Sequence, residues 1–201
     1  MIKIGIVGYN LGNQDSLYYV LKSLGFAVKM SKKTETLSKS DIIILPGVGA
    51  FPEAMKLLKK NNLIDFLVDW SSQNKPIIGI CLGMQLLCTK SYEFLECNGL
   101  NIIEGEIVPL KKKNWHIGWN NNLAKVNNFH ENLKEDYFYF NHSFKYKGDK
   151  KNILCNTVFD NEIIPSIIKK GNTIGVQFHP EKSQKSGKNL IINIVNKLVN
   201  G

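Results

Sequence analysis

The chain has 201 residues, 43% of them hydrophobic, and its net charge of +9 comes from lysine without any arginine. A chain of this length buries roughly 70% of its unfolded surface, so we expect a single domain over residues 1–201 that needs no structural metal. Dispersed lysines without arginine argue against nucleic-acid binding, because phosphate and base readers favour the arginine fork. No apolar run is long enough to cross a membrane and no signal peptide is recognisable, so we expect a cytoplasmic protein.

The first half of the chain alternates two kinds of segment. Runs rich in isoleucine and valine predict buried strands at residues 2–7, 26–30, 41–47 and 75–81. Apolar residues at helical spacing predict helices between and after these strands, at residues 17–24, 52–60, 63–70 and 82–90. Alternation of this kind favours an α/β fold, with an open, mostly parallel sheet and helices on both faces.

After residue 100 the pattern changes to short strand candidates joined by polar turns. We expect these extra strands beside the parallel core, partly antiparallel, at residues 101–110, 116–126, 137–144, 152–159, 162–170 and 172–178. An apolar stripe from Leu190 to Leu198 then predicts a closing helix. The sequence contains no internal repeat or low-complexity linker, which agrees with one domain.

Cys81 stands in the segment GICLG, between a predicted strand and a predicted helix. A glycine two residues before it and another two residues after it match the pattern of a nucleophile elbow, in which a sharp turn exposes one side chain. The start of the following helix favours a thiolate over a thiol. We interpret Cys81 as a nucleophile, and the other three cysteines as core residues without a disulfide or zinc spacing.

A thiol nucleophile needs a base, and the chain has four histidines. His130 lies in a polar stretch and is interpreted as a surface residue, and His116 lies beside an aromatic strand and is interpreted as structural. His179 ends an apolar strand and Glu181 follows two residues later, so in extended chain both side chains point to one side. We therefore predict His179 as the base, oriented by Glu181, with His142 as the second candidate.

The reaction that these residues indicate is acyl transfer through a thioester. The developing oxyanion needs backbone donors, and the amide of Leu82 directly follows the nucleophile. A second donor is expected from the glycine-rich segment PGVG, which follows another predicted strand.

Four segments, LPGVGAF, GICLGMQLL, HIGWN and GVQFHPEKS, resemble in order and spacing the class I glutamine amidotransferases. More narrowly, they are similar to the glutaminase subunits of imidazole glycerol phosphate synthases, over essentially the whole chain. The resemblance implies hydrolysis of L-glutamine to glutamate and ammonia without a metal or cofactor. It assigns roles to the catalytic residues Cys81, His179 and Glu181, the oxyanion-loop residues Gly47, Val48 and Gly49 with Leu82, and the substrate-binding residues Gln85, Glu93, His142 and Ser143.

The resemblance also implies a partner. Ammonia would pass to a separate, barrel-shaped cyclase subunit in a heterodimer that makes imidazole glycerol phosphate for histidine biosynthesis. The chain itself has no phosphate-binding loop or spare domain for a second reaction. The residues expected at the partner interface are Asn13, Trp119 and Lys182.

Two segments depart from the family pattern, GYNLGN near the start and KKKNW before HIGWN. Both fall where the partner is expected to dock. One alternative is therefore a paralogous glutaminase that supplies ammonia for amidation of a surface sugar. Another is a catalytically silent binding or regulatory module.

Overall fold

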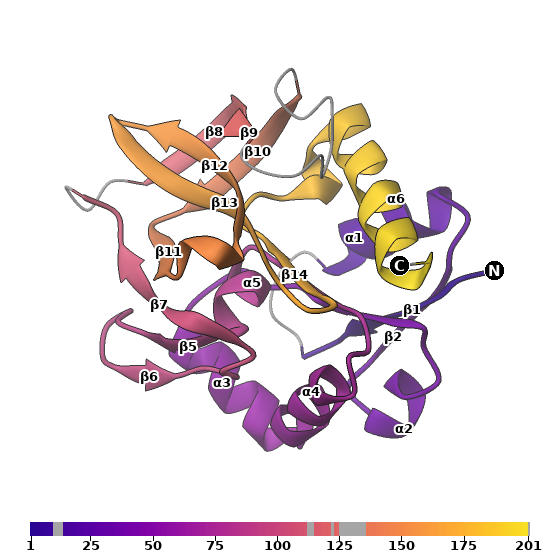
Figure 1. Ribbon diagram of the computed structural model, residues 1–201. Coiled ribbons are helices and arrows are strands. Elements are labelled where there is room, and N and C mark those ends of the chain that lie inside the picture. Colours follow the sequence, from indigo (N-terminus) through magenta and orange to yellow (C-terminus); the bar gives the residue numbers. More distant parts are fainter. Residues whose placement is uncertain (10–13, 112–114, 122, 125–135, 201) are drawn as a thin grey trace.

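The computed structural model describes residues 1–9, 14–111, 115–121, 123–124 and 136–200 (Figure 1). Its largest sheet has eight strands, of which the first five are parallel and the last three antiparallel. In spatial order they are β2 (Ala27–Ser31), β1 (Lys3–Val7), β3 (Ile42–Leu45), β4 (Ile77–Ile80), β14 (Thr173–Val176), β13 (Glu162–Lys170), β12 (Ile153–Phe159) and β9 (Leu123–Ala124). The mostly parallel sheet with added antiparallel strands confirms the predicted fold class.

Helices cover both faces of this sheet, because its parallel strands are apolar on both sides. Alternate residues of β3 point to different cores: Ile42 and Ile44 join one cluster and Ile43 and Leu45 the other. The first cluster contains residues of α1 (Gln14–Ser23) and α6 (Gln184–Asn200), and the second contains residues of α3 (Phe51–Lys60), α4 (Leu63–Ser72) and α5 (Leu82–Leu86). A short helix, α2 (Thr34–Leu37), precedes β3. Within the described ranges, no helix is long and apolar enough to cross a membrane.

Two smaller sheets accompany the large one. A four-stranded sheet has the order β11 (Phe144–Gly148), β7 (Ile103–Pro109), β5 (Cys88–Ser91) and β6 (Cys97–Asn98). A two-stranded antiparallel sheet pairs β8 (His116–Asn121) with β10 (Tyr137–His142). Two 3₁₀ turns, η2 (Lys150–Asn152) and η3 (Pro180–Lys182), complete the described elements.

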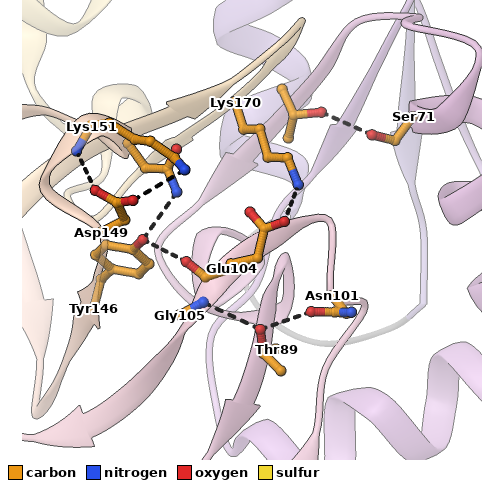
Figure 2. Close-up of polar contacts among 11 residues, drawn as sticks. Ser71, Thr89, Asn101, Glu104, Gly105, Tyr146, Asp149, Lys151 and Lys170 are labelled. Carbon is orange, nitrogen blue, oxygen red and sulfur yellow. Dashed lines mark hydrogen bonds and ion pairs between the residues drawn. The ribbon is translucent and has the colours of Figure 1, made fainter.

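Polar contacts fasten the four-stranded sheet internally and to the large sheet (Figure 2). Lys170, at the end of β13, forms an ion pair of 2.6 Å with Glu104, and the Tyr146 hydroxyl donates to the Glu104 carbonyl at 2.6 Å. The Gly105 amide donates to the Thr89 hydroxyl at 3.2 Å, which links β7 to β5. These bonds hold β5 and β7 together, and the loop that carries Glu93, a predicted substrate-binding residue, follows β5.

The helix predicted at residues 82–90 is shorter than expected. It ends at Leu86, and Cys88–Ser91 form strand β5 instead. The reason is tertiary pairing: Leu100 donates to the Leu86 carbonyl at 2.9 Å, and Ile102 donates to the Leu87 carbonyl at 2.9 Å. These bonds occupy carbonyls that a longer helix would have used, so the packing of the following segment overrides the helical spacing of the leucines.

Candidate functional site

Cys81 lies between the end of β4 and the start of α5, in a strained backbone conformation with φ 52° and ψ −110°. A positive φ is uncommon for a residue with a side chain and concentrates at functional sites. The Cys81 amide donates to the Val176 carbonyl at 2.8 Å, and the Cys81 carbonyl accepts from the Gln85 amide at 3.2 Å. The main chain of the turn is therefore held on both sides.

The two glycines that flank Cys81 are required by close packing. A Cβ atom at Gly83 would lie 1.7 Å from the carbonyl oxygen of Leu45, on the neighbouring strand. A Cβ atom at Gly79 would lie 2.7 Å from the Leu87 side chain and 2.8 Å from the Gly83 backbone. The glycines at positions 79 and 83 are thus explained by the close approach of neighbouring atoms, as expected for a nucleophile elbow.

His179 reaches the same edge of the sheet from the neighbouring strand. β14 pairs with β4 in parallel, so both carboxyl ends meet at one edge, and His179 follows three residues after β14 ends. Its amide donates to the Tyr139 carbonyl at 2.8 Å, and its own carbonyl accepts from the Ser183 hydroxyl at 2.6 Å. The Nδ1 atom of His179 lies 2.8 Å from Oε1 of Glu181, with side chains 2% and 6% exposed.

The pKa of His179 is raised by its neighbours. Burial alone would lower it, but the charge of the nearby Cys81 and the charge and hydrogen bond of Glu181 outweigh burial and raise the pKa to about 10. The Nε2 atom is buried and forms no hydrogen bond with the residues that the structure describes. The raised pKa favours the imidazolium form of His179, in which Nδ1 is held by Glu181.

A pocket of about 530 Å³ opens above Cys81. Its walls come from the segment after β3, the start of α5, the loop between β5 and β6, and the turn from β10 to β11. The residues that line it are Val48, Gly49, Ala50, Cys81, Leu82, Gln85, Glu93, Phe94, Trp115, Asn141, His142, Ser143 and Phe144.

The glycine-rich loop borders the pocket beside the nucleophile. Gly49 has a φ of +104°, a conformation that favours glycine. The Tyr9 hydroxyl donates to the Pro46 carbonyl, and the buried Tyr9 has its pKa raised by burial and by the nearby Cys81. As the first residue of α5, Leu82 has an amide that the helix itself does not use.

Two glutamines connect the pocket wall to the nucleophile. Gln85 Nε2 donates to the Gln177 side-chain oxygen at 3.2 Å and to the Phe144 carbonyl at 3.4 Å. Gln177, which is fully buried, donates from its own Nε2 to the Cys81 sulfur at 3.9 Å. Sequence reasoning missed Gln177, although it lies in the quoted segment GVQFHPEKS, because its buried position follows only from the pairing of β14.

Glu93 is held against the glycine-rich loop. Its Oε2 accepts from the Phe51 amide at 2.7 Å. Burial raises the pKa of Glu93, and the hydrogen bond from Phe51 opposes that rise. Glu93 thus places a carboxyl group in the pocket wall and also fixes the start of α3.

His142 lies in the pocket wall, but both nitrogens of its ring have hydrogen-bond partners other than Cys81. Nδ1 of His142 donates to the Phe144 carbonyl at 2.7 Å, and Nε2 lies 3.0 Å from Nδ1 of His116. Neither nitrogen is left for Cys81, so the described geometry favours His179 over His142 as the base. His130 lies outside the described residues.

The predicted site residues therefore divide into groups. Gly47 stands behind the main pocket, in a small recess that His179 and Glu181 also border. Lys182 and Trp119 lie beside the site and both contact Tyr139: the Lys182 ammonium is 5.7 Å from that ring and the Trp119 ring is 6.0 Å from it. Asn13 lies outside the described residues. The other predicted residues, apart from His179 and Glu181, line the pocket.

Sequence reasoning also missed Tyr9, Phe94, Trp115 and Asn141. Tyr9 stands in the segment GYNLGN, but nothing in that segment indicates that its hydroxyl supports the glycine-rich loop. The other three border the pocket from a loop and from strand ends, where no periodic pattern marks a functional side chain.

Comparisons with known proteins agree with this geometry. The family model described as glutamine amidotransferase class-I matches residues 7–198. The imidazole glycerol phosphate synthase subunit HisH of Lactococcus lactis is 43% identical, with 95% of this chain and 96% of the relative covered. The HisH subunit of Aquifex aeolicus is 40% identical, with 96% and 95% covered.

Solved structures extend the likeness at the level of the fold. A crystal structure titled glutamine amidotransferase has a TM-score of 0.76 and 17% identity, and covers 98% of this chain and 99% of the other. The PurLQS structure from Thermotoga maritima has a TM-score of 0.74 and 20% identity, with 98% and 99% covered. The chain belongs to the class-I glutamine amidotransferase family, among the HisH subunits of imidazole glycerol phosphate synthases.

Proposed function

We propose that the chain hydrolyses L-glutamine to glutamate and ammonia, with Cys81 as the nucleophile, and supplies the ammonia to a separate synthase subunit in the cytoplasm. The observation that carries this proposal is the meeting of Cys81 with the His179–Glu181 pair at the ends of two adjacent parallel strands. That arrangement supplies a nucleophile, an acid–base group and its orienting carboxylate.

The first half of the reaction forms a thioester. The Cys81 sulfur attacks the side-chain carbonyl carbon of glutamine, and the negative charge moves to the carbonyl oxygen. The Leu82 amide and an amide of the loop at Gly47, Val48 and Gly49 stabilise that oxygen, each donor lowering the barrier by roughly 3 kcal/mol. The C–N bond then breaks as Nε2–H of His179 gives its proton to the leaving nitrogen, which departs as ammonia.

The second half restores the enzyme. Water attacks the thioester while the neutral Nε2 of His179 accepts one of its protons, and the C–S bond breaks to release glutamate and the Cys81 thiolate. Glu181 keeps Nδ1–H of His179 in place and stabilises the imidazolium in both halves.

The pocket wall offers partners for the amino-acid head of glutamine. The Glu93 carboxyl group suits the α-ammonium group, with Gln85 beside it, and the backbone at His142 and Ser143 suits the α-carboxylate. A pocket of about 530 Å³ is ample for a free amino acid.

We further propose a barrel-shaped cyclase as the partner subunit, docked on the face of β8 and β10 beside the pocket. Ile117, Trp119 and Tyr137 expose 60%, 49% and 56% of their surface there, and tryptophan and tyrosine commonly anchor interfaces. Lys182 adds a positive charge next to Tyr139. The names of the relatives, each a subunit of imidazole glycerol phosphate synthase, support this assignment over the amidation of a surface sugar and over a silent module.

A substitution of the nucleophile in the co-purified complex tests the proposal. Cys81→Ala is expected to abolish synthesis that depends on glutamine and to leave synthesis from added ammonium salts largely intact, because the partner's own site is unchanged. Equal loss of both activities would contradict the proposed division of labour. Full retention of glutamine-dependent synthesis would exclude Cys81 as the nucleophile.

A further inference from the structure

Two exposed aromatic side chains border the pocket above Cys81. Phe94 exposes 86% of its surface and Trp115 exposes 62%, yet both line the pocket with the proposed catalytic residue. Phe94 comes from the loop between β5 and β6, and Trp115 directly precedes β8. An exposed aromatic ring contributes little to folding, because its apolar surface stays in water. Folding stability therefore does not explain why two exposed aromatic rings lie at the same pocket.

Phe94 is held outward by its backbone. Its φ is 62°, in the left-handed region that bulky residues rarely adopt. The Leu95 amide donates to the Glu93 carbonyl at 2.8 Å, and the Glu93 amide donates to the Ser91 hydroxyl at 3.1 Å. Because the Glu93 carboxyl group also accepts from the Phe51 amide, the turn that carries Phe94 is fixed to the start of α3, directly after the glycine-rich loop. Strain of this kind is typical of functional segments.

Trp115, directly before β8, is tied to β10, the strand that pairs with β8. Its indole Nε1 donates to Oδ1 of Asn141 at 2.7 Å, so the polar atom of the ring is satisfied and its apolar surface stays available. The carbonyl oxygen of the same Asn141 lies 3.8 Å from the Cys81 sulfur. Trp115 is therefore positioned by the residue that contacts the nucleophile.

We propose that Phe94 and Trp115 form an aromatic rim that packs on bound glutamine and sets its affinity. This inference rests on the proposed glutaminase function and adds the residues that recognise the substrate's apolar stem and charged head. Phe94 neighbours Glu93, so its ring is placed to act with that carboxylate on the α-ammonium group, as aromatic faces attract cations. The Trp115 ring offers an apolar surface for the two methylene groups of the substrate.

Steady-state glutaminase kinetics of the co-purified complex test the rim. Phe94→Ala and Trp115→Ala are each expected to raise KM for L-glutamine roughly 5- to 30-fold, with kcat within about two-fold of the wild type, because uniform binding is lost while the acid–base residues remain. Phe94→Leu keeps apolar area without a ring face and should give an intermediate KM. Trp115→Phe keeps a ring without the hydrogen bond to Asn141 and should retain most of the affinity.

Leu95 provides the matched control. It exposes 62% of its surface in the same turn and does not line the pocket, so Leu95→Ala should leave KM and kcat at wild-type values. An increase in KM for Leu95→Ala equal to that for Phe94→Ala would overturn the rim, because it would assign the effect to the loop rather than to the ring.

Calorimetric titration of L-glutamine into the complex that carries Cys81→Ala separates binding from chemistry. Adding Trp115→Ala or Phe94→Ala to that background should weaken binding by the same factor as the rise in KM. Unchanged affinity and unchanged KM, with normal wild-type turnover, would overturn the rim alone. A wild-type complex that neither binds nor hydrolyses glutamine would overturn the proposed function and the rim together.

Discussion

The Nδ1 atom of His116 lies 3.0 Å from the Nε2 atom of His142, and both rings are buried. Since Nδ1–H of His142 is bound to the Phe144 carbonyl, its Nε2 is the acceptor and His116 is the donor. The His116 ring is also stacked on Phe140 and Phe159, each with a centroid distance of 4.4 Å. Both histidines are thus neutral in a chain of hydrogen bonds that supports the pocket wall.

This pair predicts a loss of stability in mild acid. Burial lowers the pKa of His116 to about 4 and, with smaller contributions from other charges, that of His142 to about 3, from an ordinary value of 6.5. Between these values the unfolded chain binds protons that the folded chain does not, so the stability contributed by this pair is full above pH 6.5 and is lost as the pH drops towards 4. Urea unfolding between pH 6 and 4.5, where His179 is mostly protonated in both states, should show this decrease.

A variant isolates the contribution of the pair. His116→Gln removes one of the two groups, so the dependence of the unfolding free energy on pH should become shallower by about one proton. His179 has a raised pKa and contributes stability that decreases as the pH rises above 6.5, but it is present in both proteins, so its contribution cancels in the comparison. Identical slopes for wild type and variant would show that His116 is protonated in the folded chain.

Gly83 should not tolerate a side chain. In Gly83→Ala the new methyl group would meet the Leu45 carbonyl, so the elbow or the strand must move, and we expect a loss of stability of about 3 kcal/mol or more together with glutaminase activity. Gly25→Ala is the control: its φ is +86° and no atom lies within 4 Å of the added Cβ. It should cost only about 1 kcal/mol and retain activity. Equal effects of the two variants in thermal unfolding and turnover would refute the packing argument.

Reagents that mimic glutamine and carry an electrophile should distinguish Cys81 from the other cysteines. Burial raises the pKa of the Cys88 and Cys97 thiols, and Cys88 and Cys155 are also buried in the cores. Peptide mapping after brief labelling should therefore find the adduct on Cys81, which borders the pocket beside His179. Modification of Cys97 at the same rate would reject the assignment.

Lys182→Ala should weaken the complex with the synthase subunit. Loss of a charge at the proposed docking face is expected to raise the dissociation constant roughly five- to thirty-fold, or about 1–2 kcal/mol, without unfolding the isolated chain. Lys150, in an exposed 3₁₀ turn, provides the comparison, and Lys150→Ala should leave affinity unchanged. Surface plasmon resonance can measure the dissociation constant of both variants. Equal affinities would show that Lys182 is an ordinary solvated lysine outside the interface.

The sequence was sufficient for the parts of the site that depend on local geometry. The glycines around Cys81 predicted the elbow. The spacing of His179 and Glu181 predicted their contact, but the expected extended chain was wrong, because Glu181 lies in the 3₁₀ turn η3 that His179 precedes. Roles for residues such as Gln85 came from the family resemblance instead. Positions that depend on long-range packing were missed, among them Gln177 behind the nucleophile and strand β5, where pairing overrides a helical pattern. Exposed residues such as Trp115 carry no periodicity that would mark them.

The pairing of β4 with β14 has a consequence for folding during synthesis. Ile78 of β4 pairs with Ile174 of β14, so one of the two neighbours of the strand that ends at the nucleophile is synthesised near the end of the chain. Contacts between such distant positions close late, after the entropy of a long loop has been lost. Because His179 also follows β14, we expect glutaminase turnover to begin only after this strand has entered the sheet, so turnover would report complete folding.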